Sequence, residues 1–570
     1  MSWSTESCSG TDPGAPRVPL LRAEAWADVL SLLCFAVLSL VMIVTLPDYG
    51  LTYDEQPHIR LGETVLDFYL HGFEASSGLT RSVYGAGFDL FAAALRRISP
   101  WDEFRTNHIL CVFVAQLGLL GTWKLGRLLG GPIAGLAALL LLVLTPVYYG
   151  HQFNNPKDIP FAAGYVWGLY AIARLVACSE PPAAPRPFWR ELAARWPQGC
   201  WLGLVLGLAM SVRNAGAILI AYLFALLLAR VLDAWRLKQY PLLSELARVA
   251  LLSVVSSLLS WGVMLLFWPG ALASPLQRPA DAFEKLSRYT TYDSPTLLRG
   301  ELISSNKVPW DYLPSYFLVQ LPEWLIACWC SAVLGLLVHT GFALWRRSPI
   351  AWGAWLLLGA VLLPPAYAIL KSSTLYNGLR HFLFLMPAIS VLAGLGFSTL
   401  VRWLLRHARH VRWALLPAAL FLLFCADQLH ALWRLHPHQH VFFNRASGGL
   451  ASAVDRYETE YYGGVYQELH QQLREKIWSE RREGYLNRTW LVAGCGSKLF
   501  FARNLPLNFQ FVAMRDAGVA DFYATYVRDG CLRRFRDRVV IGQVARDGAN
   551  LALTRDMKVK KGAKPGGGSP

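Results

Sequence analysis

Charged residues are scarce in this chain of 570 residues: they make up 16% of it, where an ordinary soluble protein has about a quarter. Apolar residues make up 54%, and 22 residues are tryptophan. This composition excludes an ordinary soluble protein and predicts a polytopic membrane protein. The first apolar run is long enough to span a bilayer and is followed by no small-residue cleavage pattern, so we expect no cleaved signal peptide.

Acidic residues are fewer than basic ones, and the formal net charge is +16. A surplus of this size would suit nucleic acid if Lys and Arg formed one stripe. They fall instead in short clusters between apolar runs, as the positive-inside rule for membrane proteins requires. We therefore predict no nucleic-acid partner.

The ten cysteines are thinly spread, and none has the paired spacing of a zinc site. Most lie within apolar runs, where cysteine behaves as a small hydrophobic residue. Cys495 and Cys531 are the only two in the C-terminal part of the chain. If that part lies in an oxidising compartment they can form a disulfide, which their spacing alone does not establish.

Long apolar runs dominate the first three quarters of the chain. A transmembrane helix needs about 20 such residues. Runs that meet or approach this length lie near residues 26–46, 106–124, 131–149, 159–177, 197–212, 215–232, 249–268, 322–345, 350–370, 381–401 and 411–431. The segment 197–232 counts as two, because a single helix of about 54 Å would far exceed a hydrocarbon core of about 30 Å. We predict an α-helical polytopic membrane protein with about 11 transmembrane helices.

Basic clusters follow every second run, at Lys124 and Arg127, Arg186 to Arg195, Arg230 to Arg248, Arg346 and Arg347, and Arg402 to Arg412. The end of the bundle that carries them is predicted to face the cytoplasm. The other end then carries the long loops 47–105 and 269–321, the short loops 150–158, 213–216 and 371–380, and everything after about residue 432.

Two outer segments, 87–97 and 282–289, have apolar residues at helical spacing and are predicted to lie along the membrane interface. The polar C-terminal part predicts a small α/β domain outside the membrane. Its expected elements are a helix at 464–478, strands near 489–493, 508–513, 522–527 and 539–544, and a hairpin turn at 546–550. The expected division is a cytoplasmic N-terminus (1–25), a transmembrane domain (26–431), an extracytoplasmic domain (432–557) and a disordered basic tail (558–570).

Polar residues gather at the outer ends of the apolar runs. Asp54 and Glu55 come just after the first run, and a charge so close to hydrocarbon is costly to keep unless something uses it. The other members are His151, Asn154, Asn155, Lys157, Asp158, Arg213, Asn214, Lys371, Tyr376, Arg380 and His381. Carboxylates and bases at one depth of a membrane indicate either proton or ion handling, or a reaction on a phosphate at the headgroup level.

Three of these outer segments resemble motifs of membrane-embedded glycosyltransferases with the C-type fold, especially the protein O-mannosyltransferases and the lipid A aminoarabinose transferases. They are Tyr53-Asp54-Glu55, His151-Gln-Phe-Asn-Asn155-Pro-Lys157-Asp158 and Asn377-Gly-Leu-Arg380-His381-Phe382. The segments Phe443 to Gly449 and Tyr457 to Gly463 resemble bacterial members of the superfamily. The resemblance covers residues 26 to about 431, and the chain lacks the β-trefoil modules of the eukaryotic mannosyltransferases.

The resemblance implies transfer of a single hexosyl or pentosyl unit from a polyprenyl phosphate to a hydroxyl or amine, by an inverting single displacement on the non-cytoplasmic face. Because a phosphate leaving group needs no proton, this chemistry requires one base for the acceptor and cations for the phosphate. Asp54 is the expected base, Glu55 is expected to orient it, and Asp158 to position the acceptor. The expected substrate-binding residues are Asn155, His151, Lys157, Arg213, Tyr376, Arg380 and His381, with Arg380 first because its planar fork suits a phosphate.

A divalent metal ion, Mg or Mn, is a further candidate, with Asp54, Glu55 and Asp158 as its ligands; no nucleotide cofactor is expected. The expected partners are the lipid-linked sugar, a lipid, glycan or protein acceptor, and the membrane itself. We expect the protein in a bacterial inner membrane with its N-terminus in the cytoplasm and its C-terminal domain outside it.

Other interpretations of these residues stay open at this point. Arg213 and Lys157 can serve as interface anchors, His151 as a helix-end residue, and Asn377-Gly378 as a plain turn. A transporter would also place charges in a membrane, although it tends to show two related halves, and the sequence shows no such repeat. A scaffold without activity is the third alternative.

Overall fold

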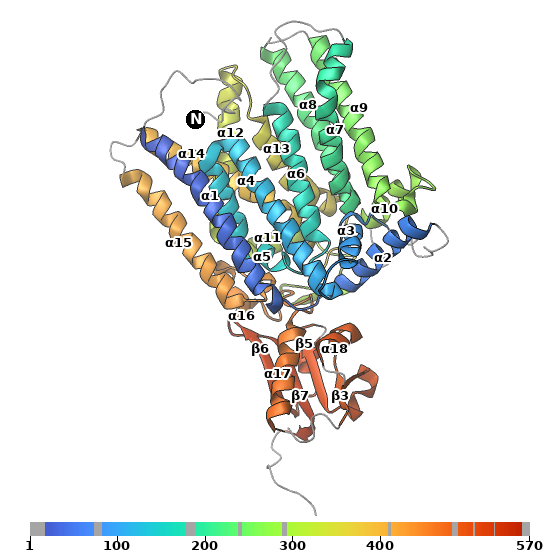
Figure 1. Ribbon diagram of the computed structural model, residues 1–570. Helices are drawn as coiled ribbons and strands as arrows, with labels where there is room; N and C mark the ends of the chain where they lie inside the picture. Colours follow the sequence, from blue (N-terminus) through green and yellow to red (C-terminus); the bar gives the residue numbers. More distant parts are fainter. Residues whose placement is uncertain are drawn as a thin grey trace, which may run out of the picture.

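Long helices form a bundle, and a small sheet domain is attached to one end of it (Figure 1). The computed structural model describes residues 18–72, 83–177, 188–237, 242–287, 293–407, 412–480, 488–505, 508–528 and 530–560. The long helices are α1 (Val18–Thr45), α4 (Glu103–Val143), α6 (Asp158–Ala177), α7 (Phe188–Val212), α8 (Ile218–Leu237), α9 (Leu242–Leu266), α12 (Glu323–Trp345), α13 (Trp352–Leu370), α14 (Met386–His407) and α15 (Arg412–Leu435). The expected polytopic helical membrane protein is confirmed.

Within the described ranges, eight helices are long and apolar enough to cross a membrane by length and composition. One of the eight, α4, contains two of the expected spans. Its helical geometry breaks at Gly130 and Gly131, where Gly131 has φ of 71°, a value that glycine adopts without strain. A Cβ atom added to Gly135 would lie 3.1 Å from the Trp123 side chain, whereas 12 residues of continuous helix would separate the two by about 18 Å. The chain therefore reverses here, and the total of about 11 spans stays a prediction.

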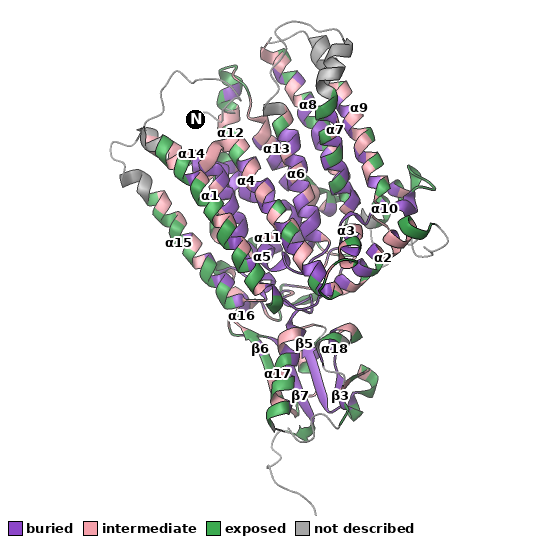
Figure 2. Ribbon diagram, in the orientation of Figure 1, coloured by how far each residue is buried: buried purple, intermediate pink, exposed green. Residues whose placement is uncertain are grey.

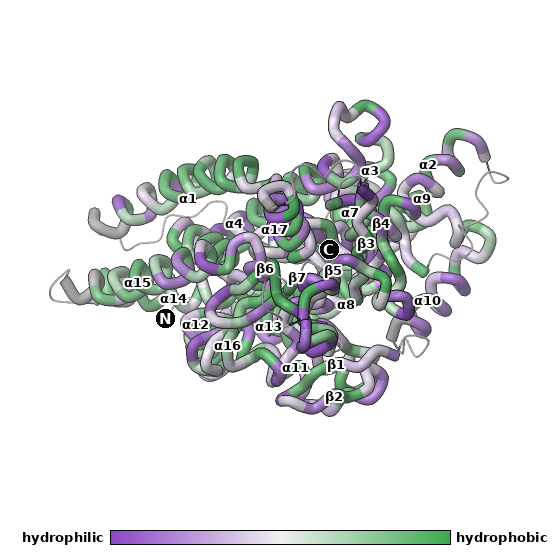
Figure 3. Tube along the Cα trace, turned by 90° about the horizontal axis from the view of Figure 1, so that it is seen from below, coloured by the Kyte–Doolittle hydropathy of each residue, from purple (hydrophilic) through white to green (hydrophobic). Residues whose placement is uncertain are grey.

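The centre of the bundle is formed by α4, α6 and α14, which are the most buried long helices in Figure 2. The helices α1 and α15 lie at one edge of the bundle (Figure 1) and are mostly hydrophobic along their length (Figure 3). Many of their leucines are exposed, among them Leu32, Leu40 and Leu422. Exposed apolar side chains on helices of this length are what contact with lipid requires.

The short elements of the long loops lie at the end of the bundle that carries the sheet domain (Figure 1). They are α2 (Glu55–His71), α3 (Gly87–Arg96), α5 (Pro146–His151), α10 (Gln277–Ser287), α11 (Tyr312–Gln320), the hairpin of β1 (Pro295–Leu298) with β2 (Glu301–Ser304), and the 3-10 helix η6 (Arg380–Leu385). Helices are present at both segments expected along the membrane interface, as α3 and α10, and their place at the interface stays a prediction; residues 288–292 lie outside the described part. The described parts of the loops expected on the outer face lie at this end; which side of the membrane it faces stays a prediction.

The C-terminal domain contains the expected helix, α17 (Val465–Glu480), and a five-stranded sheet. The strands β3 (Trp490–Ala493), β4 (Phe509–Val512), β5 (Phe522–Tyr526), β6 (Arg538–Arg546) and β7 (Ala549–Lys560) are arranged in the order β4-β3-β5-β7-β6. The β3 strand pairs in parallel with β4 and β5, and β7 pairs antiparallel with β5 and β6. Since β7 continues to Lys560, the first three residues of the expected tail belong to a strand; residues 561–570 lie outside the described part.

The disulfide between Cys495 and Cys531 is present in the structure. We expect replacement of both cysteines by serine to destabilise the domain by about 2–5 kcal/mol, because the cross-link restricts the unfolded chain. Thermal unfolding of the purified protein, followed by limited proteolysis of the domain, measures this. Cys330→Ser removes an exposed cysteine outside the disulfide and serves as the control. An unchanged unfolding temperature in the double variant would contradict the prediction.

Candidate active site

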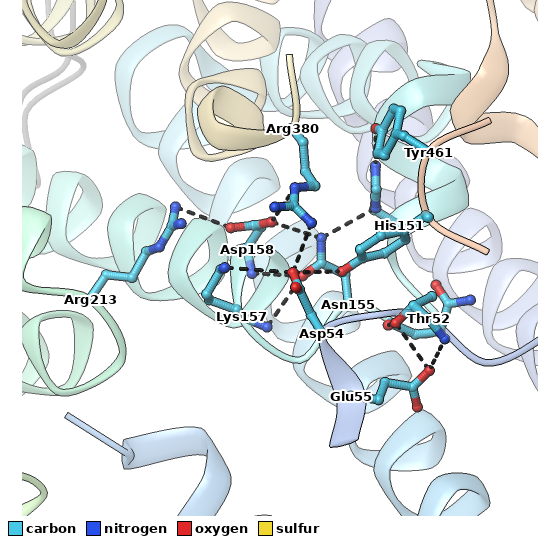
Figure 4. A network of polar contacts seen from close by, with 12 residues as sticks. Thr52, Asp54, Glu55, His151, Asn155, Lys157, Asp158, Arg213, Arg380 and Tyr461 are labelled. Atoms are coloured by element: carbon cyan, nitrogen blue, oxygen red, sulfur yellow. Dashed lines mark hydrogen bonds and ion pairs between the residues drawn. The ribbon is translucent and has the colours of Figure 1, made fainter. Parts of the chain in front are cut away.

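Asp54 lies at the centre of a charged cluster (Figure 4), at the end of the bundle that carries the sheet domain. After α1 the chain passes through the short helix η1 (Leu46–Asp48) and reaches Asp54, the residue that precedes α2. The Arg380 Nη1 atom donates to its carboxylate at 2.8 Å, and the Lys157 Nζ atom lies 3.5 Å away. The Tyr462 hydroxyl donates to the same oxygen at 3.4 Å. Residues that are 326 positions apart, Asp54 and Arg380, thus form one ion pair.

A second carboxylate, Asp158, lies on the other side of Arg380. It is the first residue of α6, where the helix dipole favours a negative charge. The Arg213 Nη1 atom lies 3.1 Å from its Oδ1 atom, and the Arg380 Nε atom lies 3.9 Å from Oδ2. The Asn155 amide donates to Oδ2 at 3.0 Å and accepts from the Asp158 backbone N–H at 2.9 Å. Arg380 therefore bridges the two carboxylates.

The cluster of Asp54, Lys157, Asp158, Arg213 and Arg380 carries two negative and three positive charges, a net charge of +1 with all five ionised. It is largely shielded from water: the exposed fraction of the side chain is 2% for Asp158, 4% for Arg380 and 21% for Asp54. Buried charges are expensive unless they are paired. A surplus of one positive charge at such a site favours a monoanionic ligand.

The cluster determines the protonation state of Asp54. Burial by itself would raise the pKa of the Asp54 carboxyl, but Arg380 and Lys157 outweigh burial and hold this pKa well below its usual range. Burial lowers the pKa of the Lys157 ammonium, although both carboxylates of the cluster act in the opposite direction. Asp54 is therefore ionised, and its negative charge is shared between two cations.

His151 and Asn155 form a layer behind the charged cluster. The imidazole is fully buried, and its Nδ1 atom lies 3.2 Å from the Asn155 amide nitrogen. Its Nε2 atom lies 3.0 Å from the Tyr461 hydroxyl. Because burial lowers the pKa of His151 to about 3, the ring is neutral at pH 7. We infer that His151 orients Asn155, and through it Asp158, rather than contributing a positive charge toward a phosphate.

Tyr376 lies beside the Arg380 side chain and packs against His381. Their rings meet edge to face with centroids 4.6 Å apart. The Arg380 guanidinium carbon lies 5.7 Å from the Tyr376 ring centroid and 5.3 Å from that of Tyr462. Aromatic faces attract a guanidinium and restrict its motion. The structure thus brings all the predicted site residues except Glu55 to one place.

Glu55 points away from the cluster, although it follows Asp54 directly (Figure 4). Its Oε1 atom accepts from the Thr52 backbone N–H at 2.8 Å, and its Oε2 atom lies 2.8 Å from His108 Nε2. The residue is 1% exposed. Successive residues at the start of a helix project in different directions, so the expected pair of carboxylates does not share one site. Glu55 fixes the loop that carries Asp54.

The expected metal site does not fit these residues. Among the described residues, no group of three or more His, Cys, Asp and Glu side chains is placed to hold a metal ion. Asp54 and Asp158 each face cationic side chains, and the third expected ligand, Glu55, faces His108. The positive charge that a metal would supply comes here from arginine and lysine.

We expect Glu55→Gln to lower stability and to leave the chemical step nearly intact. The amide keeps the bond to Thr52 and loses the charge-assisted contact with His108, which is worth about 1.5–3 kcal/mol. Thermal unfolding measures the loss, and the rate per correctly folded molecule measures the chemistry. A rate reduced as strongly as in an Asp54 variant would instead place Glu55 in the reaction.

Sequence reasoning did not assign roles to the segment after the last long helix. Glu458 accepts from the Asn377 backbone N–H at 2.6 Å and from the Thr296 hydroxyl at 2.6 Å, so it holds the turn that leads into Arg380. Tyr461 and Tyr462 reach His151 and Asp54, as described above. The available signal was the alternation of acidic and aromatic residues at 457–463, a segment otherwise noted only for its resemblance to relatives.

The C-terminal domain also touches the loop that carries Asp54. The Tyr526 hydroxyl on β5 donates to the Tyr53 hydroxyl at 3.0 Å, and the Phe500 ring meets Tyr53 edge to face at 4.7 Å. The Arg528 Nη1 atom donates to the Tyr461 carbonyl at 3.4 Å. The domain therefore packs directly on both segments that position the Asp54 carboxylate.

Among solved structures, the chain is similar to ArnT from Cupriavidus metallidurans bound to undecaprenyl phosphate, with 15% identity over 94% of this chain and 99% of that one and a TM-score of 0.45. It is also similar to the oligosaccharyltransferase AglB from Archaeoglobus fulgidus in complex with an inhibitory peptide and a dolichol-phosphate. That match has 14% identity over 88% of this chain and 70% of that one, with a TM-score of 0.46. No protein-family model and no curated protein sequence matches the chain.

Proposed function

We propose that the protein is a membrane glycosyltransferase that moves one sugar from a polyprenyl phosphate to an acceptor hydroxyl or amine. The observation that carries the proposal is the cluster around Asp54: a carboxylate shared between Arg380 and Lys157, beside a second carboxylate and Arg213. A sugar linked to polyprenyl phosphate is a phosphodiester with one negative charge, which matches the surplus of one positive charge. The resemblance of the sequence motifs supports the same reaction.

The proposed reaction is a single displacement at the anomeric carbon of the sugar. The acceptor oxygen or nitrogen forms the new bond, and the bond from the anomeric carbon to the phosphate oxygen breaks. The electron pair leaves with the polyprenyl phosphate, whose charge rises from one to two negative units. Asp54 receives the acceptor proton, while Arg380, Lys157 and Arg213 stabilise the charge that collects on the leaving oxygen.

Binding of the phosphate would activate the base. In the free protein Arg380 and Lys157 hold the pKa of Asp54 well below its usual range, which makes it a poor proton acceptor. A nearby positive charge lowers the pKa of a carboxyl group. When a phosphate pairs with Arg380 and Lys157, their effect on Asp54 weakens and the pKa of Asp54 rises. Asp54 then becomes basic only when the lipid-linked sugar is in place.

Four side chains have a positioning role, because each holds a residue of the cluster or of its supports in place: Glu458, Tyr376, Tyr462 and His151. Glu458 fixes the turn before Arg380, and the two tyrosines flank the guanidinium. His151 and Asn155 keep Asp158 oriented toward Arg213. With Asp158 already engaged in this way, we assign it to the positioning of the cations.

The test identifies the lipids that copurify with the protein. Mass spectrometry of lipids extracted from wild type should find polyprenyl phosphate or its sugar-linked form, and Arg380→Ala protein should retain less of either. Movement of a free solute into vesicles that contain the protein, with no glycosylated product, would favour a transporter.

We expect sugar transfer to survive chelation of divalent metal ions by EDTA, because arginine and lysine side chains of the protein supply the positive charge.

A further inference from the structure

A second polar pocket lies at the outer end of the bundle, outside the charged cluster. The volume of this pocket is about 500 Å³. Its walls come from the outer half of α15, the first residue of α12, the segment 442–451 and the β6–β7 turn of the C-terminal domain. None of the described residues that line it belongs to the Asp54 cluster. In Figure 1 this is the region where α15, α16 (Gly449–Ala453) and β6 approach one another.

The charges of the lining favour a ligand that donates hydrogen bonds. The described residues of the wall include three carboxylates, Glu323, Asp427 and Asp547, and two cations, Arg434 and Arg445. Arg445 pairs with Asp427, and Arg434 Nη1 lies 3.0 Å from Asp547, so one negative charge is in surplus. The carboxylate of Glu323 accepts the backbone N–H of Ala446 at 2.8 Å.

Gln428 gives a second, independent indication that the ligand of this pocket donates a hydrogen bond. Its side chain is 2% exposed, and its amide nitrogen donates to Asp427 at 3.0 Å. Its carbonyl oxygen Oε1 has no hydrogen-bond partner in the part of the chain that the structure describes. A buried acceptor without a partner costs about 1–3 kcal/mol unless a ligand or water supplies an N–H or O–H group.

The position of Asp427 places the pocket at the level of lipid headgroups. It is the only acidic residue of α15 and lies eight residues before the last residue of this helix, about 12 Å along the axis. The helix around it is apolar and exposed, with Leu429 61% and Trp433 75% accessible. Trp324, 42% exposed, stands next to Glu323 at the start of α12. Exposed tryptophans at the ends of spanning helices mark the membrane interface.

We propose that this pocket binds the headgroup of a phospholipid that carries a primary ammonium group, the phosphoethanolamine class. The ammonium donates to Gln428 Oε1 and to the carboxylates of Asp427 and Glu323, and its charge offsets the surplus negative charge. The phosphate binds Arg445, whose side chain is 72% exposed and has donors left beyond its pair with Asp427. The acyl chains lie along the exposed leucines of α15. Through Arg434 and Asp547 the bound lipid also adjoins the C-terminal domain.

A primary ammonium has three N–H donors and a choline group has none, which gives a sharp test. Binding of dioctanoyl phosphatidylethanolamine, phosphatidylcholine and phosphatidylglycerol to the delipidated full-length protein is measured by native mass spectrometry in detergent. We expect phosphatidylethanolamine to bind at least about ten-fold more tightly than phosphatidylcholine, because the choline lipid leaves the acceptors unpaired. Soluble phosphoethanolamine should bind far more weakly than the lipid.

Two variants locate the site. Gln428→Met removes the carbonyl acceptor with little change of volume, and Asp427→Asn removes the charge; each should abolish the preference for the ethanolamine lipid. Asp28→Asn, in an Asp–Arg pair at the opposite end of the bundle, is the matched control and should leave it unchanged. Equal binding of the ethanolamine and choline lipids, tightest binding of phosphatidylglycerol, or an unaltered preference in Gln428→Met overturns the proposal. Equal binding of soluble phosphoethanolamine would overturn the assignment to a lipid.

Discussion

Asp54→Asn is expected to lower the rate of sugar transfer by about 100- to 10,000-fold, the usual range for loss of a general base. The same variant should bind polyprenyl phosphate at least as tightly as wild type. The physical reason is that the Asp54 carboxylate competes with the phosphate for Arg380 and Lys157. An amide keeps the shape of the side chain but no longer neutralises these two cations.

The measurement pairs a transfer assay with binding of an unreactive polyprenyl phosphate to the same preparation. Asp67→Asn is the matched control, because Asp67 on α2 lies 3.6 Å from Arg97 outside the cluster and is 41% exposed. It should change neither quantity. Near-normal transfer by Asp54→Asn would mean that the acceptor proton leaves by another route. Weaker phosphate binding by this variant would mean that Asp54 does not compete with the phosphate.

Arg380→Ala is expected to weaken phosphate binding and to slow the chemical step together. Arg380 touches Asp54 and lies near Asp158, at the centre of the proposed phosphate site. Its contact with the phosphate should strengthen as charge collects on the leaving oxygen. Removing it also leaves two carboxylates close together without the cation between them, which destabilises the site. We expect a loss of at least about 100-fold in kcat/KM, the size seen when one strong electrostatic contact to a transition state is removed.

Arg380→Lys separates this role from that of an interface anchor. Lysine keeps the charge but cannot reach both carboxylates with a planar fork, so it should recover part of the binding and little of the rate. An anchor would tolerate lysine almost fully. Arg402→Ala, which breaks a pair with Glu24 elsewhere in the bundle, is the control for general effects on folding. Full transfer activity in Arg380→Ala would remove this residue from the proposed site.

Hydropathy and charge patterns were enough to predict the helical bundle, because a membrane imposes the length of each helix and the positions of its basic ends. The strand-like stretches and the helical segment expected in the C-terminal domain also correspond closely to β3 to β6 and α17. The two spans within α4 could be separated because the basic residues Lys124 and Arg127 lie between two apolar runs. The pair of glycines that permits the turn between them became evident only in the structure.

The sequence could place Asp54, Asp158 and Arg380 at one end of the bundle but could not predict their contacts. Those contacts depend on how α14 packs against α4 and α6, and no local pattern encodes this packing. Glu55 shows that neighbours in sequence can lie in different sites. Its position next to Asp54 suggested a pair of carboxylates, whereas the start of α2 turns the Glu55 side chain toward His108. The contact between Tyr462 and Asp54 depends on how the segment after α15 folds across the end of the bundle, which no local pattern shows.

The most direct test of the proposed reaction follows one preparation from substrate to both products. Purified protein is incubated with a synthetic polyprenyl phosphate that carries a radiolabelled sugar, together with a membrane extract as the source of acceptors. Labelled glycosylated product and free polyprenyl phosphate should appear in equal amounts in wild type, and both should fall by about 100-fold or more in Asp54→Asn. Equal product formation by wild type and Asp54→Asn, or no transfer from any polyprenyl-phosphate sugar, would contradict the assignment.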